Sequence, residues 1–155
     1  MGAILKFRVT SFWFLVFMTT FQSFEDIKAW QLSRVLLKDI RQICKRDLVK
    51  RDFSFIDQIT RSTRSISANI AEGFESRTTT EFIAYLGIAK RSAGEVRSHL
   101  YDARDEQYIT ESEFFALSEQ TKEIGRMLAG LTHYLQSTDK TKSRTLKNSE
   151  LVTSN

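Results

Sequence analysis

The sequence has no proline and only six glycines among its 155 residues. These two residue types are the main helix breakers, so their scarcity favours long, uninterrupted helices. The single cysteine, Cys44, excludes an internal disulfide and gives no sign of an oxidising compartment. Because Cys44 falls in an apolar helical pattern, we expect it to be a core or boundary residue and not a nucleophile.

The sequence also has little that would support catalysis. There are two histidines, His99 and His133, in separate segments. A di-iron site in a helical bundle needs Glu-x-x-His pairs, but Val96 and Gly130 occupy the positions three residues before the histidines. No glycine-rich phosphate loop occurs either. We therefore expect a non-enzymatic protein with no metal and no cofactor, in which both histidines are surface or boundary residues.

Residues 1–22 form an apolar N-terminal extension with two bases, Lys6 and Arg8. Its apolar run, Phe12–Met18, is far shorter than the roughly 20 residues of a membrane-spanning helix. Three interpretations stay open. In the first, which we favour, translation starts at Met18 and the upstream residues are a mis-called start. In the second, the segment is a signal or anchor, although Thr19–Gln22 lacks a small-x-small cleavage pattern. In the third, it is an ordered extension packed on the domain.

Apolar periodicity predicts four helices over residues 23–137. The first begins near Ser23 and runs to Lys45, and the second runs from Phe53 to Glu72. The third and fourth open with the capping boxes Thr78–Glu81 and Thr110–Glu113. Their apolar positions alternate steps of three and four, which is typical of coiled-coil-like packing: Phe82, Leu86, Ala89, Ala93, Val96, Leu100 and Ala103 in the third, and Phe114, Leu117, Thr121, Ile124, Leu128, Leu131 and Leu135 in the fourth.

Short connections between long helices predict an all-α, up-down-up-down antiparallel four-helix bundle. Additional apolar residues lie off these stripes, so we expect a second buried surface and a homo-oligomer. Residues 138–155 have little to bury, and we expect a disordered basic tail there.

The segment "RSISANIAEGFESR", residues 64–77, is interpreted as the end of the second helix. Gly73 is expected to adopt the left-handed conformation after the helix, with Phe74 making the following hydrophobic contact. Asn69 flanks the apolar stripe, and Glu72 lies in the last turn, where the helix dipole disfavours an acid. We expect a structural hydrogen-bonding role for both. For Glu72 we expect a specific partner, such as an arginine of a neighbouring helix or subunit, or the capped backbone of the next helix.

The formal charge of +4 lies at the ends, because residues 23–137 contain 17 bases and 17 acids. Within that part, ten bases oppose four acids between Lys28 and Arg64, whereas residues 78–137 carry six bases and nine acids. This asymmetry indicates either solvated helix faces or an anion-binding surface. The candidate nucleic-acid-binding residues are Lys38, Arg41, Lys45, Arg46, Lys50, Arg51, Arg61 and Arg64.

Residues 58–109 carry a family resemblance, which extends more weakly over residues 21–136. "QITRSTRSISANIAEG", followed by "EF", "LGIAKRS" and Glu95, resembles the bacterial four helix bundle family first known from intervening sequences of 23S rRNA genes. The chain departs from the family pattern at three positions: Thr60 replaces the first arginine of a pair, Ser67 a proline, and Arg91 a glycine.

The resemblance implies a homopentameric barrel of bundles with no established catalytic activity. It also implies kinship with the accessory variability protein of diversity-generating retroelements, a basic pentamer that engages nucleic acid and a reverse transcriptase. Asn69, Glu72, Gly73 and Glu95 belong to the motif, and we assign them a structural role.

Two functional hypotheses follow. In the first, a cytoplasmic oligomer binds RNA or DNA through its basic surface, as an accessory to a reverse transcriptase or to an rRNA-associated element. In the second, the bundle is a protein–protein scaffold without a nucleic-acid role. Neither involves a membrane.

Overall fold

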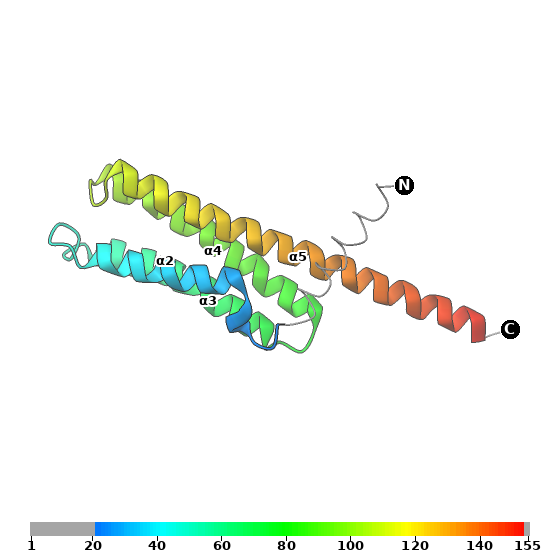
Figure 1. Ribbon diagram of the computed structural model, residues 1–155. Helices are drawn as coiled ribbons and strands as arrows, with labels where there is room; N and C mark the ends of the chain where they lie inside the picture. The colour runs from blue at the N-terminus through cyan, green and yellow to red at the C-terminus, as the bar shows by residue number, and fades with distance from the viewer. Residues whose placement is uncertain (1–20, 154–155) are drawn as a thin grey trace, which may run out of the picture.

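The structure, a computed structural model, describes the backbone of residues 21–153 and the side chains of residues 21–138. Those residues form one short 3-10 helix and four α-helices, with no strand. The elements are η1 (Phe24–Asp26), α2 (Lys28–Cys44), α3 (Phe53–Phe74), α4 (Thr79–Asp105) and α5 (Glu111–Thr153) (Figure 1). The all-α fold class is therefore confirmed, whereas the interpretations of the N-terminal extension concern residues 1–20, outside the described part.

The helices form a bundle of two antiparallel hairpins, α2–α3 and α4–α5 (Figure 1). In this bundle α2 contacts α3 and α5, and α4 likewise contacts α3 and α5. No close backbone contact joins α2 to α4, or α3 to α5, within the described residues. Each pair without contact is thus diagonal across the core, as expected for an up-down-up-down bundle. None of the described helices has the length and apolar character needed to cross a membrane.

The predicted apolar lines of α4 and α5 face the core. On α4 the buried positions alternate large residues such as Leu86 and Leu100 with Ala89, Ala93 and Ala103. Small residues at a helix contact shorten the distance between helix axes, so α4 packs closely on its neighbours. On α5 the buried Thr121 donates its hydroxyl to the Leu117 carbonyl at 2.6 Å, so this core position leaves no polar group unpaired.

Both predicted capping boxes are present. The Thr78 hydroxyl accepts from the backbone N–H of Glu81, whose carboxylate accepts from Thr78 N, and Thr110 and Glu113 make the same exchange. The start of the first helix is different from the prediction. Ser23 caps η1, and the extended backbone of Ile27 separates η1 from α2.

Gly73 corrects our prediction for the end of α3. The helix continues to Phe74, and no described glycine has a positive φ. Instead, a Cβ built on Gly73 would lie 2.6 Å from Tyr85 Cβ and 2.8 Å from Phe82 Cδ2. Glycine is therefore required by the close approach of α3 to the first turns of α4, and not by the backbone conformation.

The predicted disordered tail also differs from the structure, in which α5 continues as a helix to Thr153. Residues 138–155 contain neither proline nor glycine, so nothing in the sequence stops a helix that α5 has already started. Extending an existing helix avoids the cost of nucleation, which our prediction from burial alone did not consider.

We predict that Gly73→Ala destabilises the protein. Alanine gains up to about 1 kcal/mol of helix propensity, but contact with a Cβ that cannot rotate away forces a backbone shift costing about 1–3 kcal/mol. The urea midpoint should therefore fall. Gly130→Ala is the matched control, because a Cβ there meets nothing within 4 Å and should raise the midpoint. A Gly73→Ala protein as stable as the control would contradict the steric explanation.

Candidate nucleic-acid interface

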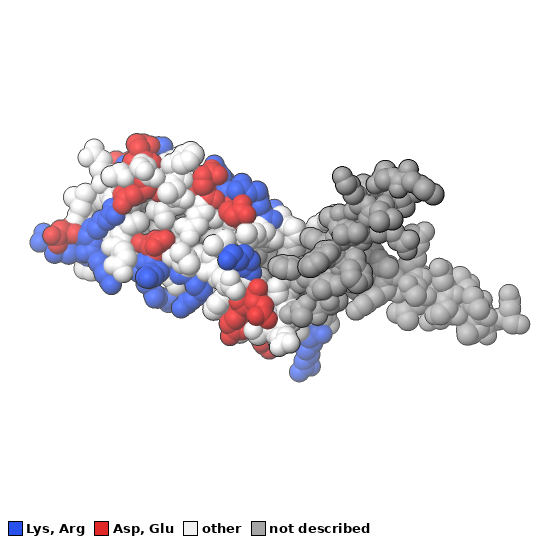
Figure 2. Space-filling view, viewed as in Figure 1, with Lys and Arg blue, Asp and Glu red and all other residues white. Residues whose placement is uncertain are grey.

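The main candidate surface is a stripe of cations along α2 and its C-cap residue, Lys45. It consists of Arg34, Lys38, Arg41 and Lys45, and we call it the α2 stripe. Their spacing of four, three and four residues places them on one face of the helix, opposite the buried positions Leu36, Ile40 and Ile43. All four are exposed, and none has a carboxylate partner among the described residues; the Arg34 guanidinium lies over the Trp30 ring at 5.9 Å. Figure 2 shows Lys and Arg side chains spread along this helix and the loop after it, with some Asp and Glu side chains among them.

The other predicted cations divide into paired and unpaired residues. Lys50 pairs with Asp47 at 2.6 Å, and Arg61 pairs with Asp57 one turn earlier on α3. Arg51 and Arg64 are exposed and make no ion pair with an acid in the described part of the chain. Arg34 was missed by the sequence analysis, although it precedes Lys38 by four residues and so completes the α2 stripe.

Arg46 corrects the prediction most clearly, because it holds two loops together. Its guanidinium forms a bidentate ion pair with Glu113 and also donates to the Tyr108 carbonyl at 2.9 Å. Tyr108 in turn donates its hydroxyl to Asp52 at 2.9 Å, while Asp52 caps α3 by accepting from Phe55 N. We call Arg46, Asp52, Tyr108 and Glu113 the loop clamp; its arginine is committed to the fold and not free for a ligand.

The loop clamp shifts the pKa of two of its members. The Arg46 guanidinium, helped by the Thr110 backbone N–H, lowers the pKa of the Glu113 carboxyl to about 2. The hydrogen bond to Asp52 raises the pKa of the Tyr108 hydroxyl above its ordinary value. Both shifts favour the protonation states that join the α2–α3 and α4–α5 loops at neutral pH.

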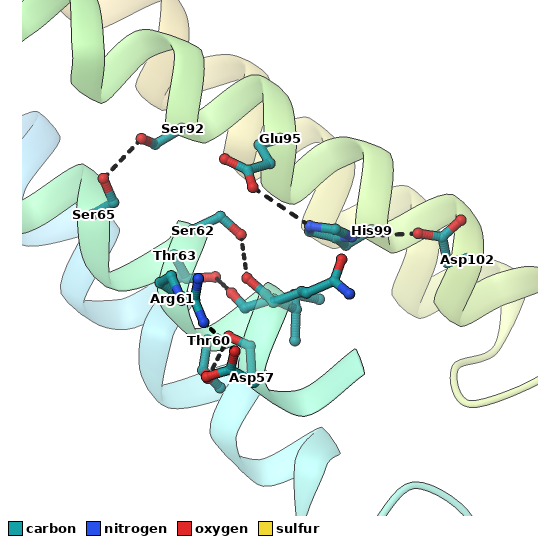
Figure 3. Close-up of polar contacts among 12 residues, drawn as sticks. Asp57, Thr60, Arg61, Ser62, Thr63, Ser65, Ser92, Glu95, His99 and Asp102 are labelled. Atoms are coloured by element: carbon teal, nitrogen blue, oxygen red, sulfur yellow. Dashed lines mark hydrogen bonds and ion pairs between the residues drawn. The ribbon is translucent and has the colours of Figure 1, made fainter. Parts of the chain in front are cut away.

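The motif residues on α3 and α4 have unequal surroundings. Asn69 Nδ2 donates to the Ser65 carbonyl at 2.8 Å and to Ser65 Oγ at 3.0 Å. Ser65 Oγ in turn lies 2.9 Å from Ser92 Oγ on α4 (Figure 3). The predicted hydrogen-bonding role of Asn69 is thus confirmed. Glu72 is exposed and makes no contact of this kind with the described residues, so a partner in another subunit stays a prediction.

Glu95, the last motif residue, lies beside His99. His99 Nε2 is 3.8 Å from Glu95 Oε1, and Nδ1 is 3.3 Å from Asp102 Oδ2 (Figure 3). The imidazole is mostly buried, with its side chain 14% exposed, which confirms His99 as a boundary residue. No three side chains of His, Cys, Asp or Glu in the described chain are grouped to hold a metal ion.

We predict that Glu113→Gln lowers stability at neutral pH by about 1 kcal/mol, because both partners are a third or more exposed and solvent screens their attraction. Glutamine keeps the capping box, so the variant isolates the charge. A lowered carboxyl pKa stabilises the fold above the unfolded pKa near 4.5, and this contribution is lost as pH falls toward 2.

Urea midpoints of the two proteins should therefore converge between pH 5 and about pH 2. Asp57→Asn is the control, since its pair with Arg61 lies within one helix and joins no loops. A gap between wild type and Glu113→Gln that does not change over this pH range would rule out the ion pair as its cause.

Comparisons with known proteins agree with the sequence resemblance. The family model described as 23S rRNA-intervening sequence protein matches residues 25–130. A crystal structure of a protein with unknown function from the S23 ribosomal protein family of Bacteroides thetaiotaomicron is similar, with a TM-score of 0.63 and 26% identity over 68% of this chain and 95% of that chain. Among curated proteins, none matches. Because the family model matches more than half of the chain, the chain belongs to the 23S rRNA-intervening sequence protein family.

Proposed function

We propose that the protein is a non-enzymatic, homo-oligomeric bundle that binds the phosphate backbone of RNA or DNA through the α2 stripe. The observation that carries this proposal is the unpaired state of Arg34, Lys38, Arg41 and Lys45. A cation with no carboxylate partner gives up no ion pair when it meets a phosphate, and each contact releases condensed counterions.

The shape of the α2 stripe supports an extended ligand. Arg34 and Lys45 are eleven positions apart, which corresponds to about 16 Å at about 1.5 Å per residue. The cations follow one line on the outer face of a single helix, which suits a backbone carrying regularly spaced charges. Four phosphate contacts of this kind give affinity without base readout, so sequence preference is not expected.

We further propose that several copies assemble, as the family resemblance implies for a pentamer. Several large apolar side chains of the described chain are exposed, among them Phe53 at 77%, Phe115 at 68% and Leu48 at 63%. An interface between copies would cover such residues and supply the partner that Glu72 lacks. A ring would also present several α2 stripes to one nucleic acid and raise its avidity. More specifically, we propose that the oligomer acts as an accessory to a reverse transcriptase or to an rRNA-associated element.

The mass in solution tests the assembly. Light scattering after size exclusion at micromolar concentration should give a multiple of the 18.0 kDa chain mass, five copies for the pentamer. A mass of one chain over the whole accessible concentration range would contradict the homo-oligomer.

Nucleic-acid affinity tests the α2 stripe. We expect Lys38→Gln/Arg41→Gln to weaken binding of duplex RNA roughly tenfold or more at 0.1 M salt, and to reduce the slope of log affinity against log salt by about 2. The matched control is Lys50→Gln/Arg61→Gln, which removes the same charge from cations already held by acids and should cost at most about threefold. Fluorescence anisotropy over a salt series measures both.

A protein–protein scaffold is the second candidate, favoured by the same exposed apolar side chains. No affinity of the oligomer for RNA or DNA at low ionic strength, or equal losses in the two double variants, would overturn nucleic-acid binding. Partners that remain bound in a pull-down after nuclease treatment would then favour the scaffold.

A further inference from the structure

A second cationic surface lies on the other hairpin. Between α4 and α5 is an open groove of about 390 Å³. Four cations line it: Lys90 and Arg97 from α4, and Lys122 and Arg126 from α5. None of them was selected from the sequence, because residues 78–137 carry more acids than bases overall.

The floor of the groove is made of small residues. Gly94 and Gly125 line it from the two helices, and a Cβ built on either glycine would meet nothing within 4 Å. These glycines therefore leave unfilled space, unlike Gly73, whose missing side chain allows two helices to touch. A ligand in the groove can approach the helix backbones without a side chain in its way.

Two of the four groove cations are unpaired, and two are held by acids. Lys90 and Arg97 are exposed and have no acid partner in the described part of the chain. Lys122 pairs with Glu119 at 2.6 Å and Arg126 with Glu123 at 2.7 Å, each within one turn of α5. By the criterion applied to Lys50 and Arg61, the affinity of the groove for an anion therefore rests on the unpaired Lys90 and Arg97.

The groove is short, which sets the size of its ligand. Lys90 and Arg97 are seven residues apart, about 10 Å along α4. Continuing the same spacing along α4, Ile83 lies before Lys90, and Arg104 lies after Arg97. Arg104 contacts Asp105 and Glu111 and does not line the groove, so the groove cations end at Arg97. The α2 stripe, by contrast, is a line on one helix, and α2 makes no close backbone contact with α4.

We propose that the α4–α5 groove binds a compact polyanion, namely a small molecule carrying two or three linked phosphate groups. Lys90 and Arg97 attract the phosphate groups from the α4 wall, and the glycine floor lets the ligand lie deep between the helices. This site is separate from the α2 stripe, and the inference does not rest on the proposed function.

Calorimetric titration of the full chain with inorganic pyrophosphate and tripolyphosphate tests the proposal. We expect saturable binding of both, at least tenfold tighter than that of orthophosphate. Lys90→Ala/Arg97→Ala should weaken tripolyphosphate binding at least tenfold. Gly94→Leu keeps every charge, and leucine has a high helix propensity, so this variant should fold. Its side chain should fill the floor of the groove and weaken tripolyphosphate binding to a similar extent.

The control is Lys28→Ala/Arg77→Ala, two exposed cations outside the groove, which should change affinity less than threefold. Absence of saturable binding, equal weakening by the control, or undiminished binding by Gly94→Leu would overturn the proposal. A short single-stranded oligonucleotide that binds the groove more tightly than tripolyphosphate would assign it to nucleic acid instead. Because duplex RNA binding is measured separately on Lys38→Gln/Arg41→Gln, failure of either site is distinguishable from failure of the other.

Discussion

The close packing of α4 against α3 and α5 is the constraint on which the rest of the structure depends. Small side chains permit it: Gly73 lets the end of α3 touch α4, and alanines alternate with larger residues along the buried face of α4. Since side-chain size at the contact sets the distance between helices, these residues also determine how near the walls of the α4–α5 groove lie. The same small residues thus influence both the packing of the core and the width of the candidate phosphate site.

Ion pairing decides which of the many basic residues are available to a ligand. Arg46 and Glu113 join loops that are far apart in the sequence, and this pairing lowers the pKa of the Glu113 carboxyl. Arg61 is balanced by an acid one turn away. The cations of the α2 stripe have no such partner among the residues that the structure describes, because their helix face carries no acid at one-turn spacing.

The two proposed anion-binding surfaces lie on different hairpins. The α2 stripe runs along α2, whereas the groove lies between α5 and α4, the helix diagonal to α2. A line of cations on one helix and a hollow between two helices suit different ligands, since an extended polyanion needs length and a compact one needs enclosure. Membership of the 23S rRNA-intervening sequence protein family accounts for the fold. The ligands are inferred from the charges and shapes of this chain alone.

The sequence by itself determined the helical class, both capping boxes and the buried lines of α4 and α5, because these follow from local periodicity and hydrogen bonds between residues three or four apart. It also identified most of the α2 stripe, which lies within one helix. Only the tertiary structure decided that Arg46 belongs to the loop clamp and that Gly73 is required by a close contact between α3 and α4. The tertiary structure also decided which cations line one groove, namely Lys90, Arg97, Lys122 and Arg126. Each of these depends on which residues distant in sequence meet in space, and periodicity along one helix carries no information about the facing helix.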